Sequence, residues 1–152
     1  MEIISIIPAR GGSKGIPLKN IIPLNRKPLL YYTVTASLNS SSINITVVTT
    51  DHGKIARAAQ RFGSEVVNRP KNLANDTIGL EPTLGYTLDY LEKKERYIPD
   101  VIVLLQNTSP LRSSKHIDEA LELFFTKKYD SVLSGSLWPT FYGKLRANML
   151  FP

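Results

Sequence analysis

Residues 3–20 read Ile-Ile-Ser-Ile-Ile-Pro-Ala-Arg-Gly-Gly-Ser-Lys-Gly-Ile-Pro-Leu-Lys-Asn, and this stretch decides the fold. An apolar run ends at Pro8 and leads into a loop that contains three glycines and three cations. Glycines let backbone N–H groups approach a ligand closely, and arginine and lysine add full positive charge to the same space. A strand that leads into such a loop predicts a cradle for a polyphosphate. A basic surface turn is the alternative interpretation.

The loop matches neither of the two commonest phosphate-binding motifs. No stretch of the chain has the Gly-x-x-x-x-Gly-Lys-Ser/Thr spacing of a Walker loop. The dinucleotide fingerprint needs a helix directly after its glycines, but here Ile16-Pro17 follows and disfavours an immediate helix. The sequence therefore favours neither a kinase-type ATPase nor a dehydrogenase.

Composition narrows the class of protein. The chain has 152 residues, 42% of them apolar, which fits one globular domain. It has no cysteine, which excludes a disulfide scaffold and thiolate metal sites. No apolar run approaches the roughly 20 residues of a membrane span, and the first strand begins at Glu2, which predicts a cytoplasmic protein without a signal peptide. The net charge of +6 fits an acidic small-molecule substrate or, as an alternative, RNA.

Apolar runs alternate with amphipathic segments along the chain, which predicts a mostly parallel sheet covered by helices on both faces. We expect strands at residues 2–7, 44–50, 65–68, 101–105 and 130–134. We expect helices at residues 28–38 and 79–94, between Asp51 and Gly63, and after Ser113 or Ser114. The expected buried stripes are Leu30, Val34 and Leu38; Ile55, Ala58, Ala59 and Phe62; Leu80, Leu84, Leu88 and Leu91; and Ile117, Ala120, Leu121 and Phe124.

Four expected strands end in polar loops, at residues 8–20, 49–52, 68–76 and 106–112. In a parallel sheet these loops lie on one rim, where ligands bind. One cleft can therefore collect their side chains.

The motifs in these loops resemble those of the acylneuraminate cytidylyltransferases, also called CMP-sialic acid synthetases. Residues 7–20 fit that family's opening motif throughout. The resemblance continues in Thr49-Thr50-Asp51, in Arg69-Pro70 with Leu73-Ala74-x-Asp76, in the stretch 104–112 (Leu-Leu-Gln-Asn-Thr-Ser-Pro-Leu-Arg), and in Asp130-Ser131-Val132. It runs from Ile3 to about Lys144, which is nearly the whole chain.

The resemblance implies a three-layer α/β/α nucleotidyltransferase fold of the Rossmann-like kind. It implies a cytidylyltransferase that transfers CMP from CTP to a sialic-acid-type nine-carbon sugar acid and releases pyrophosphate. The resemblance also implies Mg²⁺, and a homodimer is possible within this class. It assigns catalysis to Arg10, Lys14 and Lys19; the nucleotide to Ala9, Arg10, Gly11, Gly12, Ser13, Lys14, Asn20, Arg69 and Asp76; and the sugar to Gln106, Thr108, Ser109 and Lys144.

Other interpretations of single residues stay open. Asp51 and Asp76 can simply cap helices, and Arg112 can pin its own loop. His52 and His116 have no second ligand at metal spacing, so we expect both to be solvated. Trp138, Phe141 and Tyr142 fit a sugar pocket or a core equally well.

The chain also departs from the family. Asn107 stands where the family usually has proline, and Leu80 falls near the expected base site. We expect residues 1–152 to form a single nucleotidyltransferase domain that is shorter than the family's, with the family's acidic metal-binding pair beyond Pro152. Legionaminic, pseudaminic or keto-deoxyoctonic acid is an alternative substrate, and a catalytically incomplete nucleotide-binding domain is an alternative function.

Overall fold

The computed structural model describes residues 1–13, 15–75 and 78–135. The chain divides into two units, Met1–Asp118 and Glu119–Pro152. The sheet, its covering helices and the candidate site all belong to the first unit.

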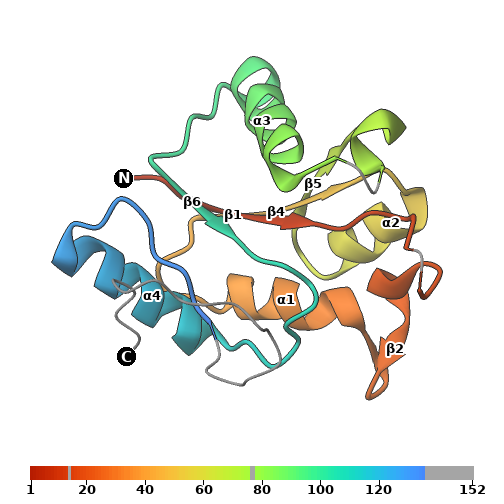
Figure 1. Cartoon of the computed structure of the whole chain (residues 1–152), viewed down its shortest axis with the longest axis horizontal. Helices are drawn as coiled ribbons and strands as arrows, with labels where there is room; N and C mark the ends of the chain where they lie inside the picture. The colour runs from red at the N-terminus through yellow and green to blue at the C-terminus, as the bar shows by residue number, and fades with distance from the viewer. Residues whose placement is uncertain (14, 76–77, 136–152) are drawn as a thin grey trace, which may run out of the picture. The chain divides into compact units, whose positions relative to one another are not determined.

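A four-stranded parallel sheet is the centre of the first unit (Figure 1). Its strands are β1 (Ile3–Pro8), β4 (Ile45–Thr50), β5 (Glu65–Asn68) and β6 (Val101–Leu104), in the order β5-β4-β1-β6. The two central strands, β1 and β4, consist mainly of apolar and β-branched residues and are almost wholly buried, as expected for strands covered on both faces. The carboxyl ends of all four strands therefore meet at one rim.

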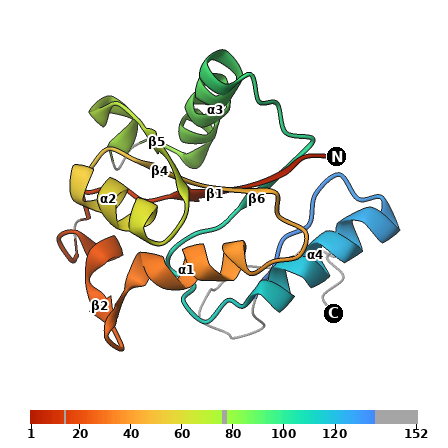
Figure 2. The same ribbon diagram turned by 180° about the vertical axis from the view of Figure 1, so that it is seen from behind.

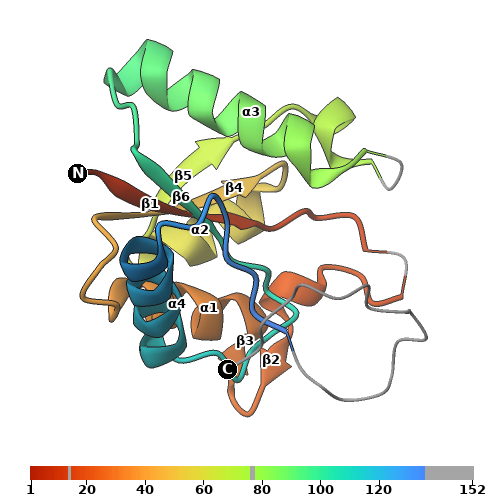
Figure 3. The same ribbon diagram turned by 60° about the vertical axis from the view of Figure 1, so that its left-hand side comes forward.

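Helices cover both faces of this sheet, which confirms the expected three layers (Figures 1 and 3). Helix α3 (Leu80–Tyr90) lies on one face. Helices α1 (Leu29–Leu38) and α2 (Gly53–Arg61) lie on the other, and the view from behind shows the same arrangement (Figure 2). The core on the α3 side consists of Ile4, Ile6, Val47, Val67 and Leu91, with Leu84 and Leu88 packed against it.

The face toward α1 contains a buried polar network. The Ser37 hydroxyl of α1 lies 2.6 Å from the Ser5 hydroxyl of β1 and 2.7 Å from the Thr46 hydroxyl of β4. Each hydroxyl can donate one bond and accept another, so this chain satisfies polar groups that would otherwise be costly to bury. The network fixes α1 against the two central strands.

The β6 side of the sheet differs from the prediction. The apolar run 101–105 predicts a strand buried on both faces, but Ile102 and Leu104 are 42% and 36% exposed. Among the described residues β6 pairs only with β1 and forms an edge of the sheet. The expected strand at 130–134 is wrong, because that segment is irregular in the structure.

The helix boundaries are close to those expected, with two corrections to the buried stripes. Leu38 is 45% exposed because α1 ends at this residue. Leu80 opens α3 and is exposed, whereas the buried positions of that helix are Thr83 and Thr87. Gly63 has φ +95°, which confirms it as the residue that stops α2.

Four short elements of the structure were not expected from the sequence. Lys19–Ile21 forms a 3₁₀ turn, η1, and Lys71–Ala74 forms another, η2. Strands β2 (Pro23–Leu24) and β3 (Lys27–Pro28) form a hairpin whose turn residues, Asn25 and Arg26, have φ of 46° and 69°. Two positive φ values in a two-residue turn are typical of type I′ hairpins, but Asn-Arg lacks the glycine that usually signals them.

Two further elements complete the described chain. The segment Leu91–Glu95, η3, continues α3 as a π-helical turn. Helix α4 (Ser114–Lys127) follows the loop after β6, and the Ser113 amide donates to Nδ1 of His116 at its start. No helix within the described ranges is both long and apolar enough to cross a membrane.

Candidate nucleotide-binding site

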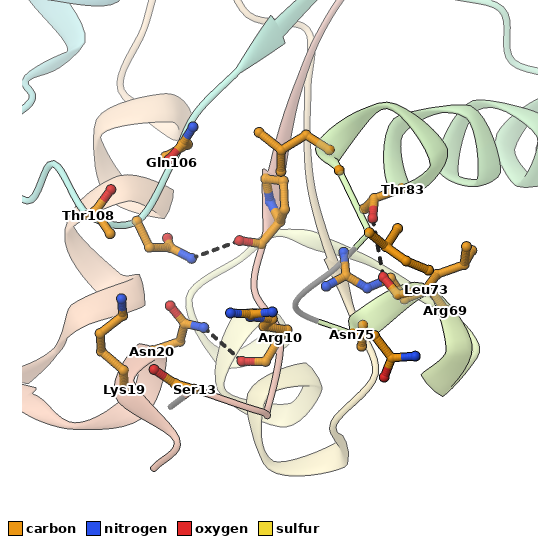
Figure 4. Close-up of a pocket in the computed structure, with 16 residues that line it drawn as sticks. Arg10, Ser13, Lys19, Asn20, Arg69, Leu73, Asn75, Thr83, Gln106 and Thr108 are labelled. Atoms are coloured by element: carbon orange, nitrogen blue, oxygen red, sulfur yellow. Dashed lines mark hydrogen bonds between the residues drawn. The ribbon is translucent and has the colours of Figure 1, made fainter. Parts of the chain in front are cut away.

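A cavity of about 290 Å³ opens at the rim where the strands end. Figure 4 shows Gln106 and Thr108 on one side of it, Arg69 and Leu73 on the other, and Arg10 between them. This arrangement follows the strand order, since these side chains come after β6, β5 and β1. The lining residues are Pro8, Arg10, Ser13, Lys19, Asn20, Arg69, Leu73, Ala74, Asn75, Ile78, Gly79, Leu80, Thr83, Gln106, Asn107 and Thr108.

The loop after β1 is tied down at several points. The Ala9 amide donates to the Thr49 carbonyl at 2.9 Å, which extends the pairing of β1 with β4. The buried Asn20 side chain donates to the Arg10 carbonyl at 3.0 Å (Figure 4). Because the backbone on both sides of Arg10 is held in this way, its side chain starts from a fixed position on the cavity wall.

Arg69 is the most unusual side chain of the site. Its amide donates to the Thr50 carbonyl at 2.9 Å, which places the residue directly after β5. The residue is only 7% exposed, and its Nε and Nη1 atoms have no hydrogen-bond partner within the described chain. Burial lowers the pKa of the guanidinium, the Asp51 carboxylate opposes that shift, and the Arg10 cation adds to it. A buried cation with unused donors is costly unless an acceptor completes it.

The wall beside Arg69 is largely apolar. It is formed by Leu73 and Ala74 of η2 and by Ile78 and Leu80 at the start of α3. The Thr83 hydroxyl donates to the Leu73 carbonyl at 3.4 Å and links these two segments. Apolar surface next to hydrogen-bond donors is the usual lining of a pocket for a heteroaromatic ring.

The loop after β6 forms the opposite wall. Asn107 is 4% exposed, and its Nδ2 donates to the Pro8 carbonyl at 3.3 Å. Arg112 donates from Nη1 to the Gln106 carbonyl at 3.1 Å, so it pins its own loop as one interpretation predicted. Partial burial lowers the pKa of Arg112. These contacts hold Gln106 and Thr108 at the cavity.

Asp51 does not cap α2, contrary to the simplest expectation. Nδ1 of His52 accepts the Lys54 amide and serves as the cap. The Asp51 carboxylate instead accepts the Gly11 amide at 2.9 Å. The loop at the end of β4 thus binds the loop after β1 and does not line the cavity.

The structure brings together seven of the residues assigned by resemblance: Arg10, Ser13, Lys19, Asn20, Arg69, Gln106 and Thr108. Four others do not line the cavity: Ala9 is buried, Gly11 and Gly12 lie outside the lining, and the Ser109 carbonyl accepts the Arg112 amide at 3.2 Å. Lys14, Asp76 and Lys144 lie outside the described residues, as do Trp138, Phe141 and Tyr142.

The sequence placed Leu80 near the base and the 68–76 loop at the rim, but it did not signal that Leu73, Ala74 and Ile78 join Leu80 in one apolar wall, nor the role of Asn107. Asn107 departs from the family pattern, and its bond to Pro8 joins segments 99 residues apart. Nothing local in the sequence signals such a bond.

Across the part of the chain that the structure describes, no group of three or more His, Asp or Glu side chains is arranged to hold a metal ion. Both described histidines use Nδ1 to accept backbone amides, from Lys54 and Ser113.

Comparison with known proteins places the chain in a family. The family described as cytidylyltransferase matches residues 4–140. The N-acylneuraminate cytidylyltransferase of Escherichia coli O18:K1:H7 is 40% identical over 134 residues, which cover 88% of this chain and 31% of that protein. The CMP-N,N'-diacetyllegionaminic acid synthase of Legionella pneumophila is 39% identical over 124 residues, covering 81% of this chain and 53% of that protein.

Solved structures agree on the fold. A cytidylyltransferase from Leptospira borgpetersenii superposes with a TM-score of 0.65 at 26% identity, over 84% of this chain and 50% of that one. A CMP:2-keto-3-deoxy-manno-octonic acid synthetase superposes with a TM-score of 0.68 at 21% identity, over 84% and 49% of the two chains. The chain spans about a third of the length of the N-acylneuraminate cytidylyltransferases that it matches. Its sequence and fold agree with these relatives, and the chain belongs to the cytidylyltransferase family.

Proposed function

We propose that this chain binds CTP in the rim cavity and takes part in the transfer of CMP to a sialic-acid-type sugar acid. The observation that carries the proposal is Arg69, a buried guanidinium that shares the cavity with Arg10 and Lys19 and whose Nε and Nη1 have no hydrogen-bond partner among the described residues. Two arginines and a lysine around one cavity raise the free energy of the empty site, and an anionic ligand lowers it. A nucleoside triphosphate supplies that charge.

The parts of CTP match the parts of the cavity. We assign the triphosphate to the loop after β1, where Arg10 can grip phosphate oxygens with two N–H groups and Lys19 acts as a point charge. We assign the cytosine to the apolar wall near Leu73 and Leu80, with Arg69 donating to its ring acceptors. Ser13 also lines the cavity and offers a further donor.

We assign the sugar acid to the opposite wall. Gln106 can donate to its carboxylate and accept from a hydroxyl, and Thr108 adds a second hydroxyl partner. The anomeric oxygen of the sugar acid would then attack the α-phosphorus of CTP. A new P–O bond forms to the sugar, the bond to pyrophosphate breaks, and the hydroxyl proton leaves to solvent. Arg10 and Lys19 would stabilise the charge that develops on the phosphate oxygens.

The family implies Mg²⁺, which would neutralise phosphate charge. The described residues offer no ligand cluster for it, and the Asp51 carboxylate is already bound to the Gly11 amide. We therefore derive no step of the reaction through a metal ion.

A direct experiment separates binding from turnover. Titration calorimetry should detect CTP binding, with weaker binding of UTP, ATP and inorganic triphosphate. Pyrophosphate release should then be measured with CTP, Mg²⁺ and N-acetylneuraminate, legionaminate, pseudaminate or keto-deoxyoctonate in turn. The proposal expects the highest kcat/KM with N-acetylneuraminate or legionaminate, since relatives named for these two sugars are 40% and 39% identical to the chain. Absence of CTP binding would contradict the proposal.

A charge substitution tests the phosphate assignment. Lys19→Ala should weaken CTP binding about ten- to a hundredfold, because one charge-assisted contact contributes about 1.5–3 kcal/mol. Lys54→Ala is the matched control, because Lys54 is exposed on α2 and does not line the cavity. Equal CTP affinity of the two variants would rule out Lys19 as a phosphate ligand.

A further inference from the structure

Two backbone amides of the loop after β1 donate hydrogen bonds to the end of β4. One bond goes to a backbone carbonyl and the other to a side chain. The Ala9 amide donates to the Thr49 carbonyl, a bond that every residue type at position 49 can accept. The Gly11 amide donates to the side chain of Asp51 at 2.9 Å. Arg10 lies between these two amides and points into the cavity (Figure 4). Two side chains therefore hold the backbone just after Arg10: Asn20 binds the Arg10 carbonyl, and the Asp51 carboxylate, which lies outside the cavity wall, binds the Gly11 amide.

The Asp51 carboxylate can accept the Gly11 amide because it does not cap α2. Nδ1 of His52 caps that helix, and the Thr50 hydroxyl accepts the His52 amide at 3.2 Å. Gly11 also packs closely on this turn, since a Cβ atom on Gly11 would lie 2.7 Å from Cδ2 of His52. The glycine and the aspartate thus fit one another: the first allows the close approach, and the second binds the amide that arrives there.

Asp51 also acts on the second arginine of the site. The Arg69 amide is bound to the carbonyl of Thr50, the residue before Asp51. The Asp51 charge favours the charged guanidinium of Arg69, against burial and against the nearby Arg10 cation. One carboxylate therefore serves the loops after β1 and β5 together.

We propose that Asp51 is a positioning residue, which holds the Gly11 amide so that Arg10 faces the cavity before a nucleotide binds. This inference rests on the proposed function, because it concerns the same cavity. Its physical content is pre-organisation: a loop that is already fixed loses less conformational entropy when the phosphates arrive. The bond between Asp51 and the Gly11 amide should therefore raise the affinity only for ligands that carry phosphates.

Two substitutions isolate the hydrogen bond from the charge. Asp51→Asn and Asp51→Ala both remove the negative charge, and only asparagine keeps an oxygen that can accept the Gly11 amide. Because loss of the charge acts alike in both variants, their difference in CTP affinity reports the hydrogen bond. We expect Asp51→Ala to bind CTP about five- to tenfold more weakly than Asp51→Asn, and both to bind cytidine equally.

Controls distinguish positioning from a general loss of structure. Asp89→Asn and Asp89→Ala change an exposed aspartate on α3 whose partner is Lys93, and should leave CTP affinity unchanged. If Asp51→Ala does not fold, Asp51→Ser replaces it, because the shorter hydroxyl side chain cannot reach the Gly11 amide. Folding is checked by circular dichroism and by the unfolding temperature.

The outcomes separate this inference from the proposed function. No binding of CTP by the unaltered chain contradicts both. Binding by the unaltered chain, with the Asn and Ala variants equal toward CTP, contradicts the positioning role alone. The positioning role is also contradicted if Asp51→Ala binds cytidine more weakly than Asp51→Asn by the same factor as it binds CTP. A pre-organised phosphate loop cannot affect a ligand without phosphates.

Discussion

Asn107 is a buried residue whose side-chain donor and acceptor lie in different environments. Its Nδ2 donates to the Pro8 carbonyl, while its buried Oδ1 has no partner in the described structure. The substitution Asn107→Asp keeps nearly the same side-chain shape but removes the donor. At pH 7 we expect a loss of about 1–3 kcal/mol in the free energy of unfolding, since a carboxylate would face a carbonyl in a buried site.

The loss in Asn107→Asp should depend on pH. Burial beside the Pro8 carbonyl should raise the pKa of the new carboxyl above its unfolded value of about 3.9, and the cations that line the same cavity should oppose this shift only in part. Such a group is tolerated below the unfolded pKa and destabilises as pH rises through the folded pKa. Urea unfolding should therefore show a smaller difference from the unaltered chain at pH 4 than at pH 7. An equal difference at both values would contradict the buried donor role of Asn107.

At the scale of the element, the loop after β1 depends on one glycine more than on its neighbours. A Cβ on Gly11 would meet His52, whereas a Cβ on Gly12 would have nothing within 4 Å. Gly11→Ala should therefore displace the loop, destabilise the fold by about 1–3 kcal/mol through overpacking, and weaken CTP binding about tenfold.

Gly12→Ala is the matched control for this change, and should leave both quantities unchanged. Calorimetry and urea unfolding measure the two effects on the same samples. If the two alanine variants have the same CTP affinity and the same free energy of unfolding, the close approach of Gly11 to the β4 turn contributes to neither.

The connection from α3 to β6 is held by hydrogen bonds between Asp100 and Glu2 and by the side chain of Tyr97. The Tyr97 hydroxyl donates to Oε2 of Glu2 at 3.2 Å, which links this connection to the start of the chain. Burial, helped by the hydrogen bond to Glu2 and the Glu2 charge, raises the pKa of Tyr97 to about 12. The stability that this tyrosine contributes is complete below its unfolded pKa of about 10 and is lost as pH rises to about 12.

Tyr97→Phe removes that dependence. Below pH 10 the variant should be less stable than the unaltered chain, and the difference should shrink as pH rises from about 10 toward about 12. Chemical unfolding at a series of alkaline pH values measures it. A difference that stays constant across this range would contradict the link between Tyr97 and Glu2.

The elements differ in how well the sequence predicts them, for physical reasons. Strands β1, β4 and β5 are short apolar or β-branched runs with polar ends, so their bounds follow from the sequence within a residue or two. The segment 130–134 has similar composition but is irregular, because a strand needs a partner and composition does not specify one. The β2–β3 hairpin was missed because its turn uses positive φ at Asn25 and Arg26 without glycine.

The residues and contacts of the candidate site also differ in how well the sequence predicts them. Arg10, Lys19 and Gln106 were predicted because strand ends in a parallel sheet share one rim and because their motifs resemble a family. The Asp51–Gly11 bond was not, since it joins residues 40 apart and helix capping was the more frequent alternative. Long-range side-chain bonds come from the assembled fold, and local sequence patterns do not encode them.

At the scale of the whole molecule, the net charge of +6 has two possible uses. If it serves one nucleotide cavity, CTP should bind with a shallow dependence on salt, and a single-stranded RNA should not bind more tightly. An RNA-binding surface with many phosphate contacts would give a steep slope of log affinity against log salt. Fluorescence titration with labelled RNA at several salt concentrations, with CTP as competitor, distinguishes them. RNA binding that is tight, strongly salt-dependent and not displaced by CTP would contradict the nucleotide assignment.

We expect the buried Arg69 guanidinium to destabilise the ligand-free protein and to contribute to the affinity for CTP. Arg69→Met keeps much of the apolar stem and removes the buried charge with its unused donors. Without CTP, the variant should unfold at the same temperature as the unaltered chain or at a higher one. The same concentration of CTP should also raise that temperature much less than in the unaltered chain.

Thermal unfolding of both proteins, with and without CTP, is the most direct test. In the unaltered chain, CTP at about a hundred times its Kd should stabilise the fold by about 2.7 kcal/mol. Arg69→Met should lose most of this increment, and its own unfolding temperature should not fall. A lower unfolding temperature with the full CTP increment intact would show that Arg69 serves the fold and not the nucleotide, and would contradict the account.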